Sequence, residues 1–530
     1  MQFGAYEELI LLALLLAIAA LLLAAPVARI PYPIFLVLGG LALGFVPGIP
    51  DLSMPPEVVL VAVLPPLLYL SAFFTSLRDL RQKAKPISLL AVGLVVVTTV
   101  TVAATAHWAI DGFSWKAAFV LGAVVSPTDP IAATSIASRL GVPRRVIAVI
   151  EGESLVNDGT ALVLWKVAVA AVVAGTFSAW DLGLEFIWSV LGGVGIGLVV
   201  GYLVAELRRR LDNPPLEVTI SLMTGYFAFL PASAAGASGV LAVVTAGVYL
   251  GWRTPELTSV QSRLQGFAMW EILTFVINAL LFALVGLQLP HIVDALEGTA
   301  STRLILDGAL VVAAVIVTRL VFVPVFLYLP RWVSRRVRER EPRPPFAYPL
   351  VISWSGMRGA VSLAAALAIP LTTDAGGAFP NRDLIIFLAF CVILGTLVLQ
   401  GLTLPTLIGA LGVEDDRLAE REDAKARIKA AEAALARLEA LVSEDWVRDD
   451  TAERLRGLYN FRRDRFAARL DGDGDGEIET RSTDYQRLRR ELLEAERGAI
   501  ISLRRAGVIN DDVMHRLQRD LDLEDARLEI

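Results

Sequence analysis

Cysteine, histidine and charge are all scarce in this chain of 530 residues. One cysteine, Cys391, and three histidines leave no disulfide framework and no thiolate-rich or imidazole-rich metal site to predict. Charged residues make up 19% of the chain, below the roughly one quarter that is usual in a soluble domain, and 55% of its residues are hydrophobic. The net charge of −6 gives no basic excess, so a nucleic-acid partner is not expected. This composition predicts a membrane protein.

The charges that are present concentrate at one end of the chain. Residues 413–530 hold 53 of the 102 charged residues, whereas residues 1–412 consist mainly of long apolar runs. We therefore predict a membrane domain over 1–412 and a soluble, helical, regulatory domain over 413–530. The first apolar run follows acidic rather than basic residues, so we interpret it as a retained membrane span and not as a cleaved signal peptide.

The apolar runs are long enough to cross a bilayer. A hydrocarbon core about 30 Å thick requires about 20 apolar residues per helix. By this measure the sequence divides into 13 predicted spans, at 9–29, 32–49, 57–76, 87–110, 115–138, 145–175, 183–206, 216–234, 236–252, 266–289, 304–329, 346–371 and 384–411. Basic residues cluster in alternate loops, and cytoplasmic loops are enriched in Lys and Arg. We predict an all-α multi-pass protein of the cell's inner membrane, with its N-terminus outside and its C-terminal tail in the cytoplasm.

Two of the predicted spans are interrupted in the middle. The fifth span contains SPTDP at 126–130, and the twelfth contains SWSGMRG at 353–359. Proline removes backbone donors, and a charged residue at membrane depth is costly unless it has a function. Spans five and twelve run in opposite directions, which predicts an inverted repeat of spans 1–6 and 8–13 with two crossed, broken helices at an ion site. Asp129 and Arg358 are candidates to neutralise the half-helix ends, and Asp129 is also a candidate ion ligand.

The sixth span carries the most informative polar residues. Ser154 and Asp158 are four positions apart and share one face of a helix, whereas Glu153 and Asn157 share another. Burial favours the neutral form of a carboxylate, so Asp158 is predicted to accept either a proton or an alkali cation at one site. Arg319 in the eleventh span is a candidate partner for Glu153. Such competition, combined with alternating access, exchanges cations for protons without a catalytic step or a cofactor, so we predict a transporter and not an enzyme.

Asn157 carries no charge, and this affects the predicted number of protons exchanged per cation. A second aspartate at that position would permit two protons per cycle, whereas a single titrating carboxylate favours a one-for-one, electroneutral exchange. The transported species are therefore expected to be H⁺ and one monovalent cation, most simply Na⁺.

Three motifs, in order along the chain, carry a family resemblance. They are 126–130 (SPTDP), 151–158 (EGESLVND) and 354–362 (WSGMRGAVS). Together they resemble the electroneutral sodium/proton exchanger branch of the monovalent cation:proton antiporters, bacterial type, over about the first 410 residues. This resemblance implies a homodimer with a mobile core domain, an elevator-like transport cycle and a function in pH homeostasis.

The resemblance also implies roles for individual residues. Asp158 would bind the ion and the proton, with help from Ser154 and Thr128. The remaining motif positions would support the site: Asn157 as the mark of electroneutral exchange, Glu153 and Arg319 as a stabilising pair, and Arg358 as a support for the twelfth span.

One position departs from the pattern of several relatives, which carry a glutamate in the third span. This chain has Leu70 there, and an aliphatic side chain cannot bind an ion. The choice among Na⁺, Li⁺ and K⁺ therefore stays open. A potassium/proton exchanger or a cation channel gated by the cytoplasmic tail remains the alternative to sodium/proton exchange.

The tail contains a short acidic motif between predicted helices. Asp471, Asp473 and Asp475 begin like a calcium-binding loop, but position 12 is Ser482 instead of the usual glutamate. A flexible acidic linker is the simpler interpretation, and calcium stays a weak hypothesis. The tail has too few apolar residues for a large core, so a small helical bundle that binds a regulator or supports dimerisation is expected.

Overall fold

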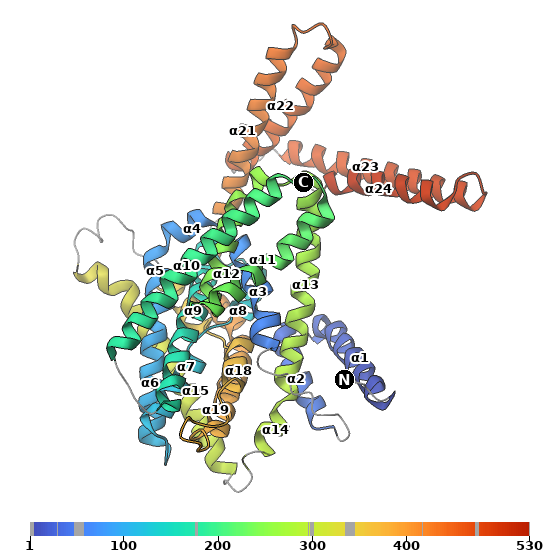
Figure 1. Cartoon of the computed structure of the whole chain (residues 1–530). Helices are drawn as coiled ribbons and strands as arrows, with labels where there is room; N and C mark the ends of the chain where they lie inside the picture. Colours follow the sequence, from blue (N-terminus) through green and yellow to red (C-terminus); the bar gives the residue numbers. More distant parts are fainter. Residues whose placement is uncertain are drawn as a thin grey trace. The chain divides into compact units, whose positions relative to one another are not determined.

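The computed structural model (Figure 1) describes residues 5–28, 30–46, 58–174, 179–294, 296, 301–333, 345–415, 417–471 and 476–528. Helices make up nearly all of its regular structure, and within these residues the only β-type pairing is an isolated bridge between Thr372 and Ala378. The chain divides into two compact units, Met1–Asp415 and Asp416–Ile530.

The first unit contains helices α1 to α20. Their bounds are α1 Ala5–Ala28, α2 Tyr32–Gly44, α3 Leu64–Phe74, α4 Leu77–Gln82, α5 Ala84–Ser88, α6 Val95–Ala109, α7 Trp115–Val125, α8 Pro130–Arg139, α9 Arg144–Val173, α10 Ala179–Arg209, α11 Pro214–Ala234, α12 Gly239–Leu257, α13 Val260–Leu287, α14 Leu289–Asp294, α15 Ser301–Val333, α17 Ala347–Trp354, α18 Ala360–Leu367, α19 Arg382–Gly395 and α20 Gly401–Ala410. Short π-helical stretches at Val58–Val63, Leu89–Leu94 and Thr396–Gln400 precede α3, α6 and α20.

Seven helical segments in the described residues are long and apolar enough to cross a membrane. They are Ala84–Ala109, Trp115–Arg139, Arg144–Val173, Gly183–Arg209, Val260–Leu287, Thr302–Leu329 and Arg382–Ala410. Three shorter apolar helices cover Leu15–Ala28, Tyr32–Gly44 and Val61–Phe74. The chain is thus an all-helical, multi-pass membrane protein, while the full count of 13 spans stays a prediction. The boundary predicted between the eighth and ninth spans, at residue 235, falls within the connection between α11 and α12.

Polar caps fix where several of these helices begin. The side chains of Ser114, Asn213, Ser238 and Ser259 accept backbone hydrogen bonds at the first turns of α7, α11, α12 and α13. Such caps satisfy amide groups that have no partner within the helix. They matter in an apolar environment, where an unpaired amide is costly.

Two apolar clusters make up the packed interior of the first unit. The larger one joins buried residues of α2, α6, α7, α9, α13, α15 and α19. The smaller one joins α3, α10, α11 and α12, and Leu155 of α9 belongs to it. Leu162 of α9 packs against both clusters. Helix α9 therefore lies along the boundary between the two clusters, which places its polar residues there.

The second unit consists of two helical hairpins. Helices α21 (Leu418–Leu441) and α22 (Asp449–Asp471) form the first, and α23 (Gly476–Arg505) and α24 (Asp511–Leu528) form the second (Figure 1). Buried residues in the first hairpin are few and mostly small: Ala424, Ala431, Ala452 and Phe466. The calcium hypothesis rests on Asp473 and Asp475, which lie outside the described residues, and on Asp471, whose side chain is not described either.

Candidate ion-binding site

The first interruption separates α7 from α8. Helix α7 ends at Val125 and α8 begins at Pro130, so residues 126–129 leave the helical path. Pro127 and Pro130 lack the amide hydrogen that a continuous helix needs. Asp129 caps α8, because its Oδ1 accepts a hydrogen bond from the backbone amide of Ile131 at 2.9 Å.

The second interruption separates α17 from α18. Helix α17 ends at Trp354 and α18 begins at Ala360, and the backbone amide of Asp129 donates to the carbonyl of Met357 at 2.8 Å. The two interruptions are therefore in direct contact. A Cβ atom at Gly359 would overlap the Asp129 carboxylate, so only glycine allows this close approach. The Asp129 carboxylate consequently lies beside the start of both α8 and α18, where negative charge is favoured by the helix dipoles.

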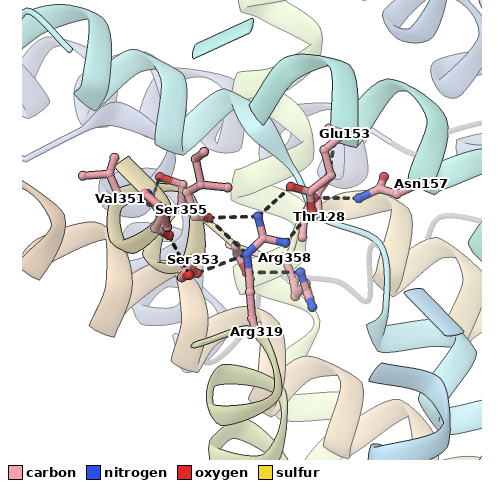
Figure 2. Close-up of polar contacts among 12 residues, drawn as sticks. Thr128, Glu153, Asn157, Arg319, Val351, Ser353, Ser355 and Arg358 are labelled. Atoms are coloured by element: carbon pink, nitrogen blue, oxygen red, sulfur yellow. Dashed lines mark hydrogen bonds and ion pairs between the residues drawn. The ribbon is translucent and has the colours of Figure 1, made fainter. Parts of the chain in front are cut away.

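A buried ion pair lies on one face of α9. Glu153 and Arg319 are each 1% exposed, and both guanidinium Nη atoms donate to the Glu153 carboxylate, Nη2 to Oε2 at 2.8 Å (Figure 2). Arg319 also donates to the carbonyls of Ile352 at 3.0 Å and Ser353 at 3.1 Å, near the carboxyl end of α17. One arginine thus compensates a buried carboxylate and the end of a broken helix, with bidentate, charge-assisted hydrogen bonds.

Thr128 connects this pair to the rest of the site. Its hydroxyl accepts a hydrogen bond from Asn157 Nδ2 at 2.7 Å and lies 3.4 Å from Glu153 Oε1, as Figure 2 shows. Its backbone carbonyl accepts a hydrogen bond from Ser154 Oγ at 2.8 Å. The family resemblance implies that Thr128 assists Asp158 together with Ser154. The structure directs its hydroxyl to the Glu153–Asn157 face and its carbonyl to the Ser154 side.

Arg358 is also buried, with 1% of its surface exposed. Its Nη1 donates to the carbonyl of Gly356 at 3.2 Å, and its backbone amide donates to Thr396 Oγ1 at 3.0 Å. These contacts tie the interrupted segment 355–359 to the π-helical stretch Thr396–Gln400. Arg358 therefore lies at the second interruption, in the same buried region as Arg319.

Asp158 differs from every charged residue described so far. It is 6% exposed, yet no described residue forms a hydrogen bond or an ion pair with its carboxylate. Instead, Asp158 lines a cavity of about 100 Å³ together with Ser154, Thr128 and Asp129. One water needs roughly 10–15 Å³ of such space, so the cavity is large enough for an alkali ion with part of its hydration shell.

The walls of this cavity come from both apolar clusters. Leu64 and Leu68 of α3 belong to the smaller cluster, and Phe282 of α13 belongs to the larger one. Ser362 of α18 also lines the cavity, and its buried hydroxyl has no hydrogen-bond partner among the described residues. The cavity is therefore mostly apolar, with Asp158, Ser154, Thr128 and Ser362 among its few oxygen-bearing lining residues, and oxygen ligands suit hard alkali cations.

A wider, more open cavity of about 630 Å³ adjoins the first. It is lined by Glu151 of α9, Glu271 of α13 and Ser138 of α8, and Ile131 and Asn278 line both cavities. We call this wider cavity the vestibule. Leu70, which is 8% exposed, also lines it. The vestibule thus has two carboxylates, Glu151 and Glu271, and the aliphatic Leu70 in its lining.

No role was predicted for Asn278, which lies in the predicted apolar span 266–289. It is 3% exposed and lies where the two cavities meet. A single amide in the middle of an apolar helix is the signal that could have identified it, because such a group is buried only with a partner or a function. Ser362, at the end of a quoted motif, was not assigned a role either.

A cavity beside two touching helix interruptions in an all-helical membrane unit is typical of secondary transporters. The chain belongs to the sodium/hydrogen exchanger family, whose transmembrane region matches residues 10–409. It is therefore a membrane transporter of the cation/proton antiporter class.

Relatives and solved structures agree with this assignment. The chain is 39% identical over 504 residues to an uncharacterized Na⁺/H⁺ exchanger of Mycobacterium tuberculosis, covering 94% of this chain and 92% of the relative. It is 35% identical over 388 residues to a sodium, potassium, lithium and rubidium/H⁺ antiporter of Bacillus subtilis, covering 71% and 58%. The fold resembles that of the sodium proton antiporter MjNhaP1 from Methanocaldococcus jannaschii, with a TM-score of 0.59, 20% identity and coverage of 77% and 99%.

Proposed function

We propose that this protein exchanges Na⁺, and other alkali cations, for H⁺ through Asp158. The observation that carries the proposal is a buried carboxylate that has no partner among the described residues and lines a cavity with Ser154 and Thr128. An uncompensated buried charge is unfavourable, so the site gains free energy by taking up either a proton or a cation. Because both neutralise the same oxygen atoms, binding of one releases the other.

The stoichiometry rests on how the neighbouring carboxylates of the site are held. Glu153 is neutralised by Arg319, and Asp129 caps α8 and lies beside the start of α18. Asn157 carries no charge. We infer that Asp158 alone changes its occupancy during the cycle, which gives one cation for one proton and an electroneutral exchange.

The vestibule supplies the route to this site. It is lined near the end of α8 by Ser138, next to the connection 140–143, which Arg139 and Arg144 flank. Because basic loops lie in the cytoplasm, this opening faces the cytoplasm in the proposed orientation. Access from the opposite side requires the broken helices to move relative to α3 and α13, which is the alternating-access step of a 13-span inverted repeat with crossed helices.

The choice of cation is governed by the oxygen atoms around Asp158. Leu70 is aliphatic and lines the vestibule, so no carboxylate is available at that position to bind a cation. With fewer carboxylate ligands, the site selects less strongly for a small, strongly hydrated ion. The Bacillus subtilis relative is named for sodium, potassium, lithium and rubidium. Exchange of K⁺ as well as Na⁺ is therefore the second candidate activity.

The remaining assignments concern assembly and location. We propose a homodimer in the inner membrane, with an outside N-terminus and the second unit in the cytoplasm as a regulatory domain. The support is the pattern of basic loops, the family membership and the many charged residues of helices α21 to α24.

Replacement of Asp158 by Asn tests the proposal. Purified protein is reconstituted into proteoliposomes with an internal pH dye, and a panel of alkali chlorides is added outside. Asp158→Asn should abolish cation-dependent proton movement, because the amide cannot bind and release a proton. Asp374→Asn, at an exposed carboxylate, is the matched control and should exchange normally. Undiminished exchange by a folded Asp158→Asn variant would disprove the assignment.

A voltage clamp tests the stoichiometry. Gradients of the permeant anion thiocyanate set the membrane potential across the same vesicles, with Na⁺ as the exchanged cation and no K⁺ present. An electroneutral exchanger should show the same rate at every potential. A rate that changes steeply with potential would contradict one-for-one exchange while leaving the role of Asp158 intact.

A further inference from the structure

Helix α23 has two apolar sides, and α24 covers only one of them. On the covered side, Leu493 is 1% exposed and packs in the hairpin with Met514 and Leu521, each 7% exposed. Arg497 donates to Asp522 at 2.8 Å and to Asp525 at 3.0 Å, which fixes α24 on this side.

The other side carries an exposed apolar stripe. It consists of Tyr485, Leu488, Leu492, Ala495 and Ala499, and we call it the α23 stripe. Tyr485 is 60% exposed, Leu488 61% and Leu492 47%, and the two alanines are exposed as well. The spacing of three, four, three and four residues is the heptad spacing of a helix that packs against another helix.

The hairpin has few other apolar contacts. Among the described residues of α23 and α24, only Leu493, Met514 and Leu521 are buried apolar side chains. Helical hairpins of this size are usually stabilised by packing into a larger bundle, because a small core does not offset the loss of conformational entropy. The α23 stripe is the surface through which such a bundle would form.

We propose that the α23 stripe binds the same stripe of a second copy of this chain, in antiparallel orientation, so that two hairpins form a four-helix bundle. The first argument is shape. The bulky residues lie in the amino-terminal half of the stripe and the small residues in the other half. Two-fold antiparallel pairing places Leu492 against the partner's Ala495 and Leu488 against the partner's Ala499, whereas parallel pairing stacks bulky on bulky and small on small.

The second argument is charge. Antiparallel pairing brings Arg489 near the partner's Glu496 and Asp484 near the partner's Arg505, and the symmetry repeats each contact. Parallel pairing places Glu491 beside the partner's Glu496, where like charges repel, and offers only Asp484 beside the partner's Arg489 in return. Arg489 also pairs with Glu524 in its own hairpin, so the interhelical contact extends an existing cluster of charges. Both charge contacts named for the antiparallel pair are attractive, which favours that orientation.

Cysteine cross-linking in the full-length protein tests this orientation. The single native cysteine is first removed by Cys391→Ala. The variant with both Leu488→Cys and Ala499→Cys should form covalent dimers under mild oxidation, read on a non-reducing gel. Residues 488 and 499 are about 16 Å apart along one helix, so any disulfide between them must join two chains.

Single variants provide the controls. Leu488→Cys alone should remain monomeric on the gel, because the two copies of residue 488 are also about 16 Å apart along the antiparallel pair. Glu494→Cys, at an exposed position off the stripe, should not cross-link either. Efficient dimers from Leu488→Cys alone would show a parallel pair, and no dimers from the double variant would show that the stripe binds something else. Either result overturns the proposal.

A second pair of positions tests the same orientation without changing the apolar residues of the α23 stripe. Asp484→Cys with Arg505→Cys places both thiols on exposed flanks of the stripe, and a short bismaleimide should join them between chains. Cation/proton exchange by each variant, measured in proteoliposomes, should equal that of Cys391→Ala. Cross-linking therefore reports on the α23 stripe, and exchange reports on Asp158, so the two proposals fail separately.

Discussion

Each of the two polar faces of α9 carries one buried carboxylate, but the surroundings of the two carboxylates differ. On one face, Glu153 is held by two guanidinium nitrogens of Arg319 and Asn157 is hydrogen-bonded to Thr128. On the other face, Asp158 lines a cavity and has no partner among the described residues. The two carboxylates are five residues apart on one helix. Their difference shows that burial alone does not decide the state of a carboxylate, since one has a counter-ion and the other has none among the described residues.

Loss of the Glu153 counter-ion should have the largest effect on the folded protein. Arg319→Ala leaves a buried carboxylate uncompensated, which costs about 3–5 kcal/mol. The expected result is a strong fall in the yield and thermal stability of detergent-solubilised protein, measured by fluorescence-detected size exclusion. The double variant Glu153→Gln with Arg319→Gln removes both charges and should recover part of the stability. If Arg319→Ala were as stable as the parent, Glu153 would not be a fixed charge.

Asn157→Ala tests the other polar residue on the face of α9 that carries Glu153. It removes the donor to Thr128 Oγ1 and leaves a buried hydroxyl with one fewer partner, at a cost of about 1–3 kcal/mol. The melting temperature and the maximal exchange rate should fall, because the 126–129 segment is held less firmly. An unchanged apparent KM for Na⁺ would place Asn157 outside the ion site, whereas a raised KM with full stability would place it within.

Asn278→Leu tests the passage between the vestibule and the cavity at Asp158. The substitution keeps the approximate volume but removes the amide that lines both cavities. Exchange should require a several-fold higher cation concentration, with thermal stability close to that of the parent. Phe282→Leu, at an apolar wall of the same cavity, is the matched control. Equal KM values for Asn278→Leu and the parent would show that the amide does not assist the ion.

Ser154→Ala should have the smallest effect. It removes a hydroxyl beside Asp158 together with its 2.8 Å hydrogen bond to the Thr128 carbonyl. A loss of about 1 kcal/mol in cation binding corresponds to roughly a fivefold rise in KM. Proteoliposome titrations with Na⁺ and K⁺ check this, and a larger change for Na⁺ would identify the hydroxyl as a ligand that favours the smaller ion. No change for either cation would assign Ser154 to structure alone.

Much of the site follows from local sequence rules. Prolines at 127 and 130 predict an interruption, and the spacing of 153, 154, 157 and 158 predicts two faces, because a helix repeats every 3.6 residues. The contact between Asp129 and Met357 could not be read in this way, since it joins segments more than 200 positions apart. Asn278 was overlooked because a lone amide gives no periodic pattern.

Local sequence is sufficient to predict a helical membrane protein with a charged tail, since hydropathy and helical spacing depend only on near neighbours. Arg319 was predicted from the sequence as a candidate partner of Glu153, but only the tertiary structure shows the two side chains in contact. Arg319 lies 166 positions from Glu153, and packing of α9, α15 and α17 brings it to Glu153 rather than to Asp158. Electrostatic compensation depends on distance in space, and that is why Asp158 was left to share its site between a cation and a proton in the proposed cycle.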